Sequence, residues 1–360
     1  MTNEGKSTPA ADASGVPYAG ADSSRFRSSG VAAGEDQATF DDGAAVVVLM
    51  GTYNGEAHIE EQLRSIAEQT YRNWRLVVSD DGSTDRTLEI IAAFAAGRPE
   101  GQVTVVGGPG VTGHGRKPGR DTRELATVNF LSLLTQGAIT GDYFALADQD
   151  DVWSPSKLSR AMAWLVSLPQ GEPALYCART ELIGESGRPA GLSPLFKKPP
   201  SFRNALVQSI AGGNTMVLNR PARDLVAAFG MADVVAHDWW LYLLLSGCGA
   251  HIRYDPVTSV GYRQHGANLV GSNRGLAALV ARGQIFAGGV WADWTDRHVA
   301  ALQPALHLLT PENRLLLERL VDFRQEALMS RIRILSDLGL YRQTLVGQIT
   351  MAAAVLTGRL

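Results

Sequence analysis

Apolar runs alternate with helix-patterned segments between residues 44 and 150, and this alternation most constrains the fold. A continuous apolar run at 44–50 is typical of a buried strand. It is followed by Ile59, Leu63 and Ile66, which recur at helical spacing. Further strands are predicted at 74–79, 103–106 and 143–147, with helices from a cap at Ser83 or Thr84 through Phe94 and over 125–134. Strands joined by helices predict an α/β fold with a mostly parallel sheet flanked by helices.

The composition divides the chain into three parts. Residues 1–43 are rich in Gly, Ala and Ser and hold few large apolar residues, so we expect a disordered tail. The α/β domain is predicted to cover 44–272, and 273–360 should form a helical C-terminal region. Within the α/β domain, further short strands are expected at 173–178 and 214–218 and a helix at about 237–245.

Charge and cysteine usage exclude several classes of protein. A formal net charge of -3 gives no basic signature of nucleic-acid binding. The two cysteines, Cys177 and Cys248, have neither zinc spacing nor a disulfide framework, which fits a reducing compartment. No apolar stretch reaches the roughly 20 residues that span a bilayer, and the first residues lack the pattern of a secretory signal. We therefore expect a cytoplasmic protein, or one peripheral at the inner face of the cell membrane.

Two groups of carboxylates follow predicted strands directly. Asp80 and Asp81 come after one apolar run, and Asp148, Asp150 and Asp151 come after another. Because ligands bind at the carboxyl ends of strands in open parallel sheets, we expect these side chains at one edge of the sheet. Mg²⁺ takes oxygen ligands, often one or two carboxylates together with substrate phosphates. The pattern therefore favours a site for a cation and a diphosphate.

Six short motifs, in a fixed order, carry a resemblance to a known family. They are Thr52-Tyr53-Asn54-Gly55, Gln69-Thr70-Tyr71, Asp80-Asp81-Gly82-Ser83-Thr84-Asp85, Asp148-Gln149-Asp150-Asp151-Val152-Trp153, His237-Asp238-Trp239-Trp240 and Tyr262-Arg263-Gln264-His265. Together they resemble family 2 glycosyltransferases of the GT-A fold, and most closely the bacterial rhamnosyltransferase branch. The resemblance covers about 44 to 270 and weakens in the helical C-terminal region. It implies a GT-A (Rossmann-like) sheet with a helical C-terminal extension.

The resemblance assigns a nucleotide-binding role to the turns after the first strands. Asp81 is expected to accept the ring N–H of a uracil or thymine base. Asp148 is expected to touch the ribose or a metal-bound water. The wider set of nucleotide-sugar-binding residues is Thr52, Tyr53, Asn54, Glu56, Asp81, Asp148 and Gln149. For the first turn the alternative is an ordinary Asn-Gly turn, and for Asp81 a helix N-terminal acid stabilised by the helix dipole.

The resemblance also implies a metal site and a catalytic base. Asp150 corresponds to the direct ligand of Mg²⁺ or Mn²⁺. His265 is a candidate for a further metal or diphosphate contact, beside an Arg263 that faces the phosphates. Asp238 is expected to act as the general base of an inverting transfer, which needs one carboxylate to take the proton of the acceptor hydroxyl. The alternative for Asp238 is a helix N-cap followed by two core tryptophans.

The acceptor side is expected to involve Asp151 and the two tryptophans. Asp151 is predicted to face the acceptor. Trp239 and Trp240 are predicted to supply an apolar wall and a face on which a sugar stacks.

Two segments leave alternatives open. The basic, Gly-rich loop 107–123 departs from the family pattern and is either a lid over the diphosphate or a solvated insertion. The apolar stripes of the C-terminal helices pack onto the catalytic domain or a second subunit, or rest on an anionic bilayer face.

These observations predict a metal-dependent, inverting glycosyltransferase. The donor is expected to be dTDP-L-rhamnose, with a UDP-sugar second, and the acceptor a saccharide, possibly lipid-linked, of a cell-surface polysaccharide. A sugar-nucleotide nucleotidyltransferase is the alternative enzyme, although the Gly-rich basic loop that it needs after the first strand is replaced by Thr52-Tyr53-Asn54-Gly55-Glu56. A non-catalytic nucleotide-sugar binding subunit is the alternative outside enzymes.

Overall fold

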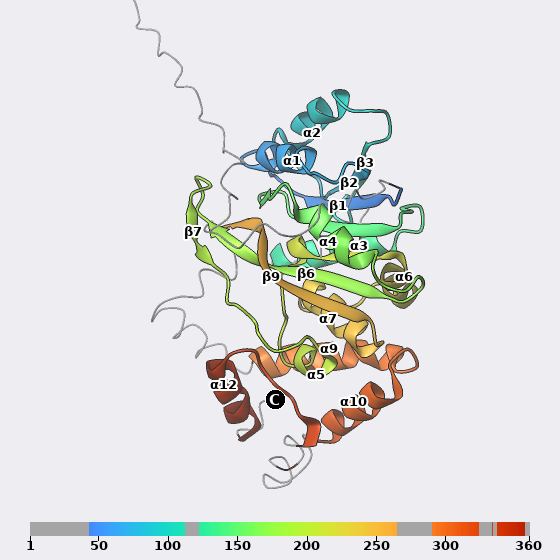
Figure 1. Cartoon of the computed structure of the whole chain (residues 1–360), viewed down its shortest axis with the longest axis vertical. Helices are drawn as coiled ribbons and strands as arrows, with labels where there is room; N and C mark the ends of the chain where they lie inside the picture. Colours follow the sequence, from blue (N-terminus) through green and yellow to red (C-terminus); the bar gives the residue numbers. More distant parts are fainter. Residues whose placement is uncertain (1–42, 112–121, 265–289, 324–332, 334–336, 357–360) are drawn as a thin grey trace, which may run out of the picture.

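The computed structural model describes residues 43–111, 122–264, 290–323, 333 and 337–356. The predicted tail, most of the basic loop and His265 lie outside these residues. The C-terminal helices gather at the opposite end of the molecule from α1 and α2 (Figure 1).

One nine-stranded sheet organises the molecule, in the order β3-β2-β1-β4-β8-β6-β9-β5, with β7 paired to β6. Its first four strands in this order are parallel, as the sequence predicts. The strands are β1 (Val46–Thr52), β2 (Trp74–Asp80), β3 (Val103–Gly107), β4 (Tyr143–Ala147), β5 (Val152–Trp153), β6 (Ala174–Ile183), β7 (Pro189–Leu192), β8 (Val217–Asn219) and β9 (His251–Arg263).

The other half of the sheet is mixed rather than mostly parallel. Strand β8 is antiparallel to both β4 and β6, and β5 is antiparallel to β9. Strand β9 runs parallel to β6 over most of its length, and the sequence did not indicate its first half. Its first half carries the polar residues His251, Arg253 and Asp255, so it contains no continuous apolar run. Pairing with β6, rather than local pattern, makes this segment a strand.

Helices cover both faces of the sheet. They are α1 (Ile59–Ala67), α2 (Thr87–Ala96), α3 (Thr122–Thr135), α4 (Lys157–Leu165), α5 (Phe202–Ala205), α6 (Arg220–Phe229), α7 (His237–Gly247), α9 (Val290–Leu302), α10 (Pro311–Phe323) and α12 (Leu345–Leu356), with short 3₁₀ turns η2 (Gly213–Thr215) and η3 (Gln303–Ala305). Helix α2 begins later than the sequence indicates. Asp85, rather than Ser83 or Thr84, accepts the backbone N–H of Thr87 in the first turn, at 3.0 Å.

The alternation of side chains along β1 divides the core into two clusters. Val47 and Leu49 face one cluster, which also contains apolar residues of α3, α6 and α7. Val46, Val48 and Met50 face the other, which contains apolar residues of α1 and α4. Both faces of β1 are therefore buried, which explains its uninterrupted apolar sequence.

The C-terminal helices pack onto the first of these clusters. Leu302 of α9, Leu317 of α10 and Met351 of α12 are all fully buried within it. Packing onto the catalytic domain, one of the alternatives left open by the sequence, is therefore present. No helix in the described part of the chain combines the length and apolar character needed to cross a bilayer.

Trp240 of α7 offers a test of the packing within the first core cluster. Its side chain is fully buried, and its ring lies 4.9 Å from that of Phe229, between centroids. We expect Trp240→Ala to lower the free energy of unfolding by about 3–5 kcal/mol, because a large cavity opens in the core. Urea unfolding measures this. Leu88→Ala, at a position 41% exposed on α2, is the matched control and should change stability by about 0.5 kcal/mol at most; equal effects of the two would contradict the packing.

Candidate active site

The carboxyl ends of β1, β2 and β4 lie side by side. Thr52 is in register with Asp80, and Met50 with Ala147, the residue before Asp148. The turn after β1 and the two acidic groups after β2 and β4 therefore meet at one edge of the sheet, as predicted.

Asp80 fixes the turn after β2. Its Oδ2 accepts hydrogen bonds from the hydroxyls of Thr52 at 2.9 Å and Ser83 at 2.6 Å. Its Oδ1 accepts from the backbone N–H groups of Gly82 and Ser83, at 3.0 and 2.8 Å. With 5% of its surface exposed, Asp80 supports the site from within rather than presenting a free carboxylate.

Asp81 is held by the segment that follows β3. Its Oδ1 accepts the N–H of Gly110 at 2.5 Å. A Cβ at Gly108 or Gly110 would lie only 2.7 or 2.8 Å from that oxygen, so glycine is required for this approach. A carboxylate has about four acceptor sites, so Asp81 keeps the capacity to accept a further hydrogen bond.

The turn after β1 is clamped from both sides. Gln149 accepts the N–H of Tyr53 at 2.9 Å and donates to its carbonyl at 3.1 Å. Asn54 adopts a φ of 47°, and its Oδ1 accepts the N–H of Thr84 at 2.9 Å. Glu56 accepts the N–H of Arg86 at 3.0 Å. Gln149, Asn54 and Glu56 therefore hold the turn in shape, while the Tyr53 ring stays 40% exposed at its tip.

Four carboxylates gather beyond these turns. Desolvation, together with the charges of Asp150 and Asp238, raises the pKa of Asp148 to about 7. The pKa of Tyr262 is raised first by burial and then by the charges of Asp148, Asp151, Asp150 and Asp238. The acids after β4 and the acid at the start of α7 therefore share one electrostatic neighbourhood, although 88 residues separate Asp150 from Asp238.

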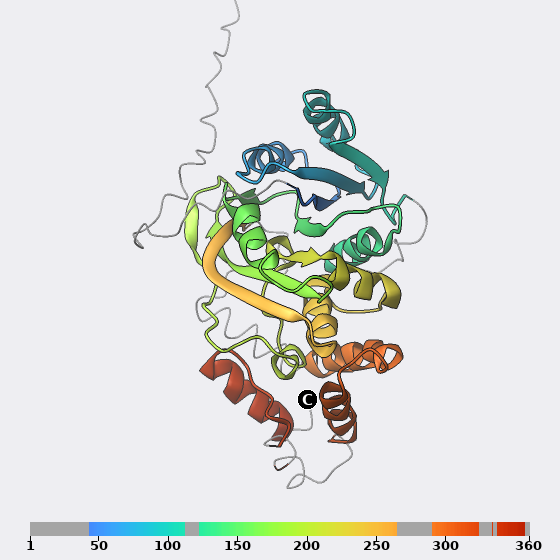
Figure 2. The ribbon, with the colours of Figure 1, turned by 45° about the vertical axis from the view of Figure 1, so that its right-hand side comes forward.

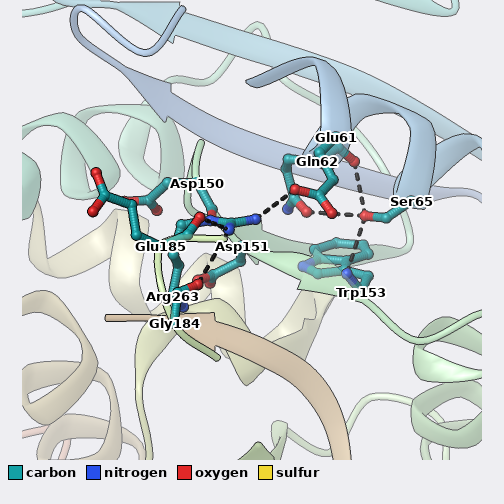
Figure 3. A network of polar contacts seen from close by, with 9 residues as sticks. All are labelled: Glu61, Gln62, Ser65, Asp150, Asp151, Trp153, Gly184, Glu185 and Arg263. Carbon is teal, nitrogen blue, oxygen red and sulfur yellow. Dashed lines mark hydrogen bonds and ion pairs between the residues drawn. The ribbon is translucent and has the colours of Figure 1, made fainter. Parts of the chain in front are cut away.

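Arg263, at the end of β9, ties this region together. Its guanidinium donates to the carbonyls of Asp150 at 2.8 Å and Glu185 at 2.6 Å, and pairs with the carboxylate of Glu61 at 2.6 Å (Figure 3). Only 1% of the residue is exposed. The prediction that Arg263 faces the phosphates is therefore wrong. Its guanidinium instead binds α1, the acidic turn and the β6–β7 turn and holds them together.

Asp151 is buried beneath the site instead of facing an acceptor. None of its surface is exposed, and its carboxylate accepts from the side chain of Asn214 and from the N–H of Arg263 at 3.2 Å. Burial and the neighbouring acids raise the pKa of Asp151 well above its usual value. The acceptor-facing role expected for this residue is therefore wrong, because η2, through Asn214, and β9, through Arg263, enclose it.

Asp238 lies at the start of α7 and keeps partial contact with solvent. Desolvation raises its pKa to about 6, against the opposing effects of a hydrogen bond from the Trp239 N–H and of the nearby Arg123. A carboxylate with a pKa of about 6 is ionised at neutral pH and is a stronger base than an ordinary aspartate.

The two tryptophans after Asp238 belong to the core. Trp240 has no exposed surface, and Trp239, 7% exposed, donates its ring N–H to the carbonyl of Ala205 at 2.7 Å. Trp240 therefore has no face for a sugar, which corrects the expected stacking role. The reason is that α7 is covered on every side: all its residues from 239 to 247 are buried.

Lys157 is a member of the site that the sequence analysis missed. Its side chain is fully buried, with Nζ 3.4 Å from the centroid of the Trp153 ring. Among the described residues Nζ has no hydrogen-bond partner. Desolvation lowers the pKa of Lys157 to about 7, against the charges of Asp151 and Asp148. No local pattern indicated this, because Trp153 lies in β5 and Lys157 begins α4, and their contact depends on the fold.

The residues present fit a hard cation that shares its ligands with a substrate. Asp148 and Asp150 offer carboxylate oxygens beside one another. No group of three or more His, Cys, Asp or Glu side chains suited to a metal occurs in the described part of the chain. A cation held by one or two carboxylates, with phosphate oxygens and water completing its shell, requires no larger group.

Comparisons with known proteins agree with this geometry. The family described as Glycosyl transferase family 2 matches residues 47–116. The dTDP-rhamnosyl transferase RfbG of Shigella flexneri is 29% identical over 266 residues, covering 71% of this chain and 84% of that protein. The UDP-Glc:alpha-D-GlcNAc-diphosphoundecaprenol beta-1,3-glucosyltransferase WfgD of Escherichia coli is 28% identical, covering 55% of this chain and 68% of its own.

Among solved structures, that of S. aureus TarS 1–349 superposes loosely, with a TM-score of 0.47 and 17% identity. The superposition covers 76% of this chain and 86% of the TarS chain. The family match contains the turn after β1 and the acids after β2, and the sequence similarity to RfbG extends well beyond it. Residues 47–116 therefore match the family 2 glycosyltransferases, and similarity to a member named as a dTDP-rhamnosyl transferase extends over 71% of the chain.

Proposed function

We propose that the protein transfers L-rhamnose from dTDP-L-rhamnose to a saccharide acceptor, with inversion at the anomeric carbon and with Mg²⁺ or Mn²⁺. The observation that carries the mechanism is the shared neighbourhood of Asp148 and Asp150, which follow β4, and Asp238, at the start of α7. The donor rests on the likeness to RfbG, named as a dTDP-rhamnosyl transferase. A UDP-sugar is the second choice of donor.

The base of the donor is proposed to lie between Tyr53 and Asp81. The half-exposed Tyr53 ring offers an aromatic face at the tip of the turn. The carboxylate of Asp81 accepts the imide N–H of thymine or uracil in addition to the N–H of Gly110. Cytosine has no proton at that ring position and would leave Asp81 unmatched.

Asp238 is proposed to take the proton of the acceptor hydroxyl as its oxygen attacks the anomeric carbon. The bond to the diphosphate oxygen breaks on the opposite face of the sugar, so one base suffices and no covalent nucleophile is needed. Asp150, with Asp148, would hold the cation, which neutralises negative charge on the departing diphosphate. Lys157 limits the mutual repulsion of these acids from behind.

The acceptor is proposed to be a growing surface polysaccharide, possibly lipid-linked. WfgD, named for a diphosphoundecaprenol acceptor, supports the lipid-linked form. We also propose that the reaction takes place in the cytoplasm, because both Cys177 and Cys248 are free thiols.

Incubation with labelled dTDP-rhamnose, UDP-glucose and UDP-N-acetylglucosamine, with and without Mn²⁺, tests the proposal. Donor hydrolysis or transfer that needs Mn²⁺ and favours dTDP-rhamnose is the expected result. Metal-independent binding without turnover would overturn the catalytic proposal, whereas turnover of a UDP-sugar alone would overturn only the donor.

Asp238→Asn should lower the rate of transfer by about 100-fold or more, the scale of general-base loss, while the Kd for the donor stays near normal. The amide keeps the size of the side chain but cannot accept the proton. Single-turnover kinetics and calorimetric donor titration separate the two quantities. Asp224→Asn, on an exposed acid of α6, is the control, and an equal loss of binding and turnover would contradict the role of Asp238 as the base.

The rate of transfer should rise with pH through about 6 and level off above about 7. Below its pKa Asp238 is protonated and cannot act as a base, so the rate falls about tenfold for each further pH unit. The titration of Asp148 and Lys157 overlaps this range, so the profile is measured with saturating donor and metal. A rate that is flat between about pH 5 and 8 would be incompatible with Asp238 as the base.

Asp150→Ala should abolish the response to Mn²⁺, because it removes the direct carboxylate ligand and leaves Asp148 as the one carboxylate proposed to hold the cation. Mn²⁺ titration of the rate, and calorimetry of Mn²⁺ with dTDP present, both report this. Glu89→Ala, an exposed acid on α2, is the control. Persistent stimulation by Mn²⁺ would remove Asp150 from the ligand set.

A further inference from the structure

Helix α12 turns a row of apolar side chains toward solvent. Leu345, Val346 and Ile349 are 77%, 51% and 61% exposed, and Ala352, one turn on, is also exposed. These four residues, called here the apolar stripe, follow the helical repeat along one side of α12. The helix contains no charged residue. Scattered single apolar residues are normal on a surface, but a continuous stripe indicates a contact.

The opposite side of α12 is anchored. Met351 and Ala354 are fully buried in the core. The hydroxyl of Thr344 accepts the N–H of Gly347 at 3.1 Å and caps the first turn. Both views place α12 at the outside of the molecule, at the end remote from α2 (Figures 1 and 2). The outward direction of the stripe is therefore set by packing on the other face.

Cationic side chains lie at the beginning of the helix. Lys198 donates to the carbonyl of Arg342 at 2.8 Å, and Gln343 accepts its backbone N–H at 3.0 Å. The side chain of Arg342 lies along the first turn, where a Cβ at Gly347 would come within 3.2 Å of it. Lys197 is exposed beside them. Lys197, Lys198 and Arg342 form the basic cluster, and no acidic residue follows Asp337 in the chain.

This combination fits a lipid surface better than a second copy. In a two-fold dimer the same patch meets itself, so two basic clusters would be brought together without acids to oppose them. A stable interface also covers about 800 Å² on each partner, which a stripe on one 12-residue helix does not supply alone. Anionic headgroups complement the basic cluster, and the acyl boundary accepts the stripe.

We propose that α12 is an interfacial helix that docks the protein on an anionic phospholipid bilayer, with the apolar stripe at the acyl boundary and the basic cluster among the headgroups. The helix lies in the plane of the interface and does not cross it. The surface is separate from the acidic site, so this proposal stands or falls independently of the transfer chemistry.

Co-sedimentation of the full chain with vesicles tests the proposal. We expect binding to vesicles of phosphatidylcholine mixed with phosphatidylglycerol, and much weaker binding to phosphatidylcholine alone or at high salt. The double variant Leu345→Gln/Ile349→Gln should bind at least 10-fold more weakly. Lys197→Gln should weaken binding about 5-fold, the effect of one basic residue near an anionic surface.

The matched control is Leu315→Gln/Val321→Gln on α10, where two apolar side chains are 52% and 41% exposed but lie beside acids. It should bind vesicles as the unmodified chain does. Thermal unfolding and donor hydrolysis show that each variant is folded, and the single variant Ile349→Gln is measured beside the double one.

Absence of vesicle binding by the unmodified chain, or binding by the stripe variants equal to that of the unmodified chain, would overturn the proposal. A dimer in sedimentation velocity that the stripe variant dissociates, without vesicle binding, would assign the surface to a second copy.

Discussion

The buried guanidinium of Arg263 is the interaction on which the arrangement of the site depends. It joins the acidic turn after β4, the β6–β7 turn and α1, and its own N–H binds Asp151. A buried charge is stable only when its donors are matched, so these segments are held in one relative position. Because Asp150 contributes its carbonyl to this network, its side chain is presented from a rigid turn, which suits the proposed role as a cation ligand.

In the acidic site, repulsion between carboxylates is partly offset by neighbouring groups that stabilise them. Carboxylates that share a neighbourhood raise one another's pKa, which is the energetic cost of assembling the proposed diphosphate and cation site in advance. Lys157 and the hydrogen bonds to Asp151 offset part of that cost from the buried side. Asp238, outside this supported group and at the start of its own helix, keeps a pKa near 6 and is thereby suited to a different task.

The two halves of the sheet carry different parts of the proposed site. The parallel half of the sheet carries the turns proposed to bind the nucleotide, and the mixed half carries the residues that support the acids. The C-terminal helices cover α7, which carries Asp238, and leave one side of α12 uncovered. The site and the proposed membrane surface therefore sit on different parts of one core, so each can be altered without the other.

Apolar period and strand ends are local properties, so the sequence was enough to predict the first four strands and the edge at which the acids meet. The helices between these strands were also predicted, although α2 begins later than expected because Asp85 binds its first turn. The sequence also singled out Asp81, Asp150 and Asp238, whose roles stay predictions. The folded structure alone revealed the full extent of β9, the buried supporting roles of Arg263 and Asp151, the core position of Trp240, and the place of Lys157 behind the acids. Each of these depends on contacts between residues far apart in the chain, and such contacts leave no periodic pattern in the sequence.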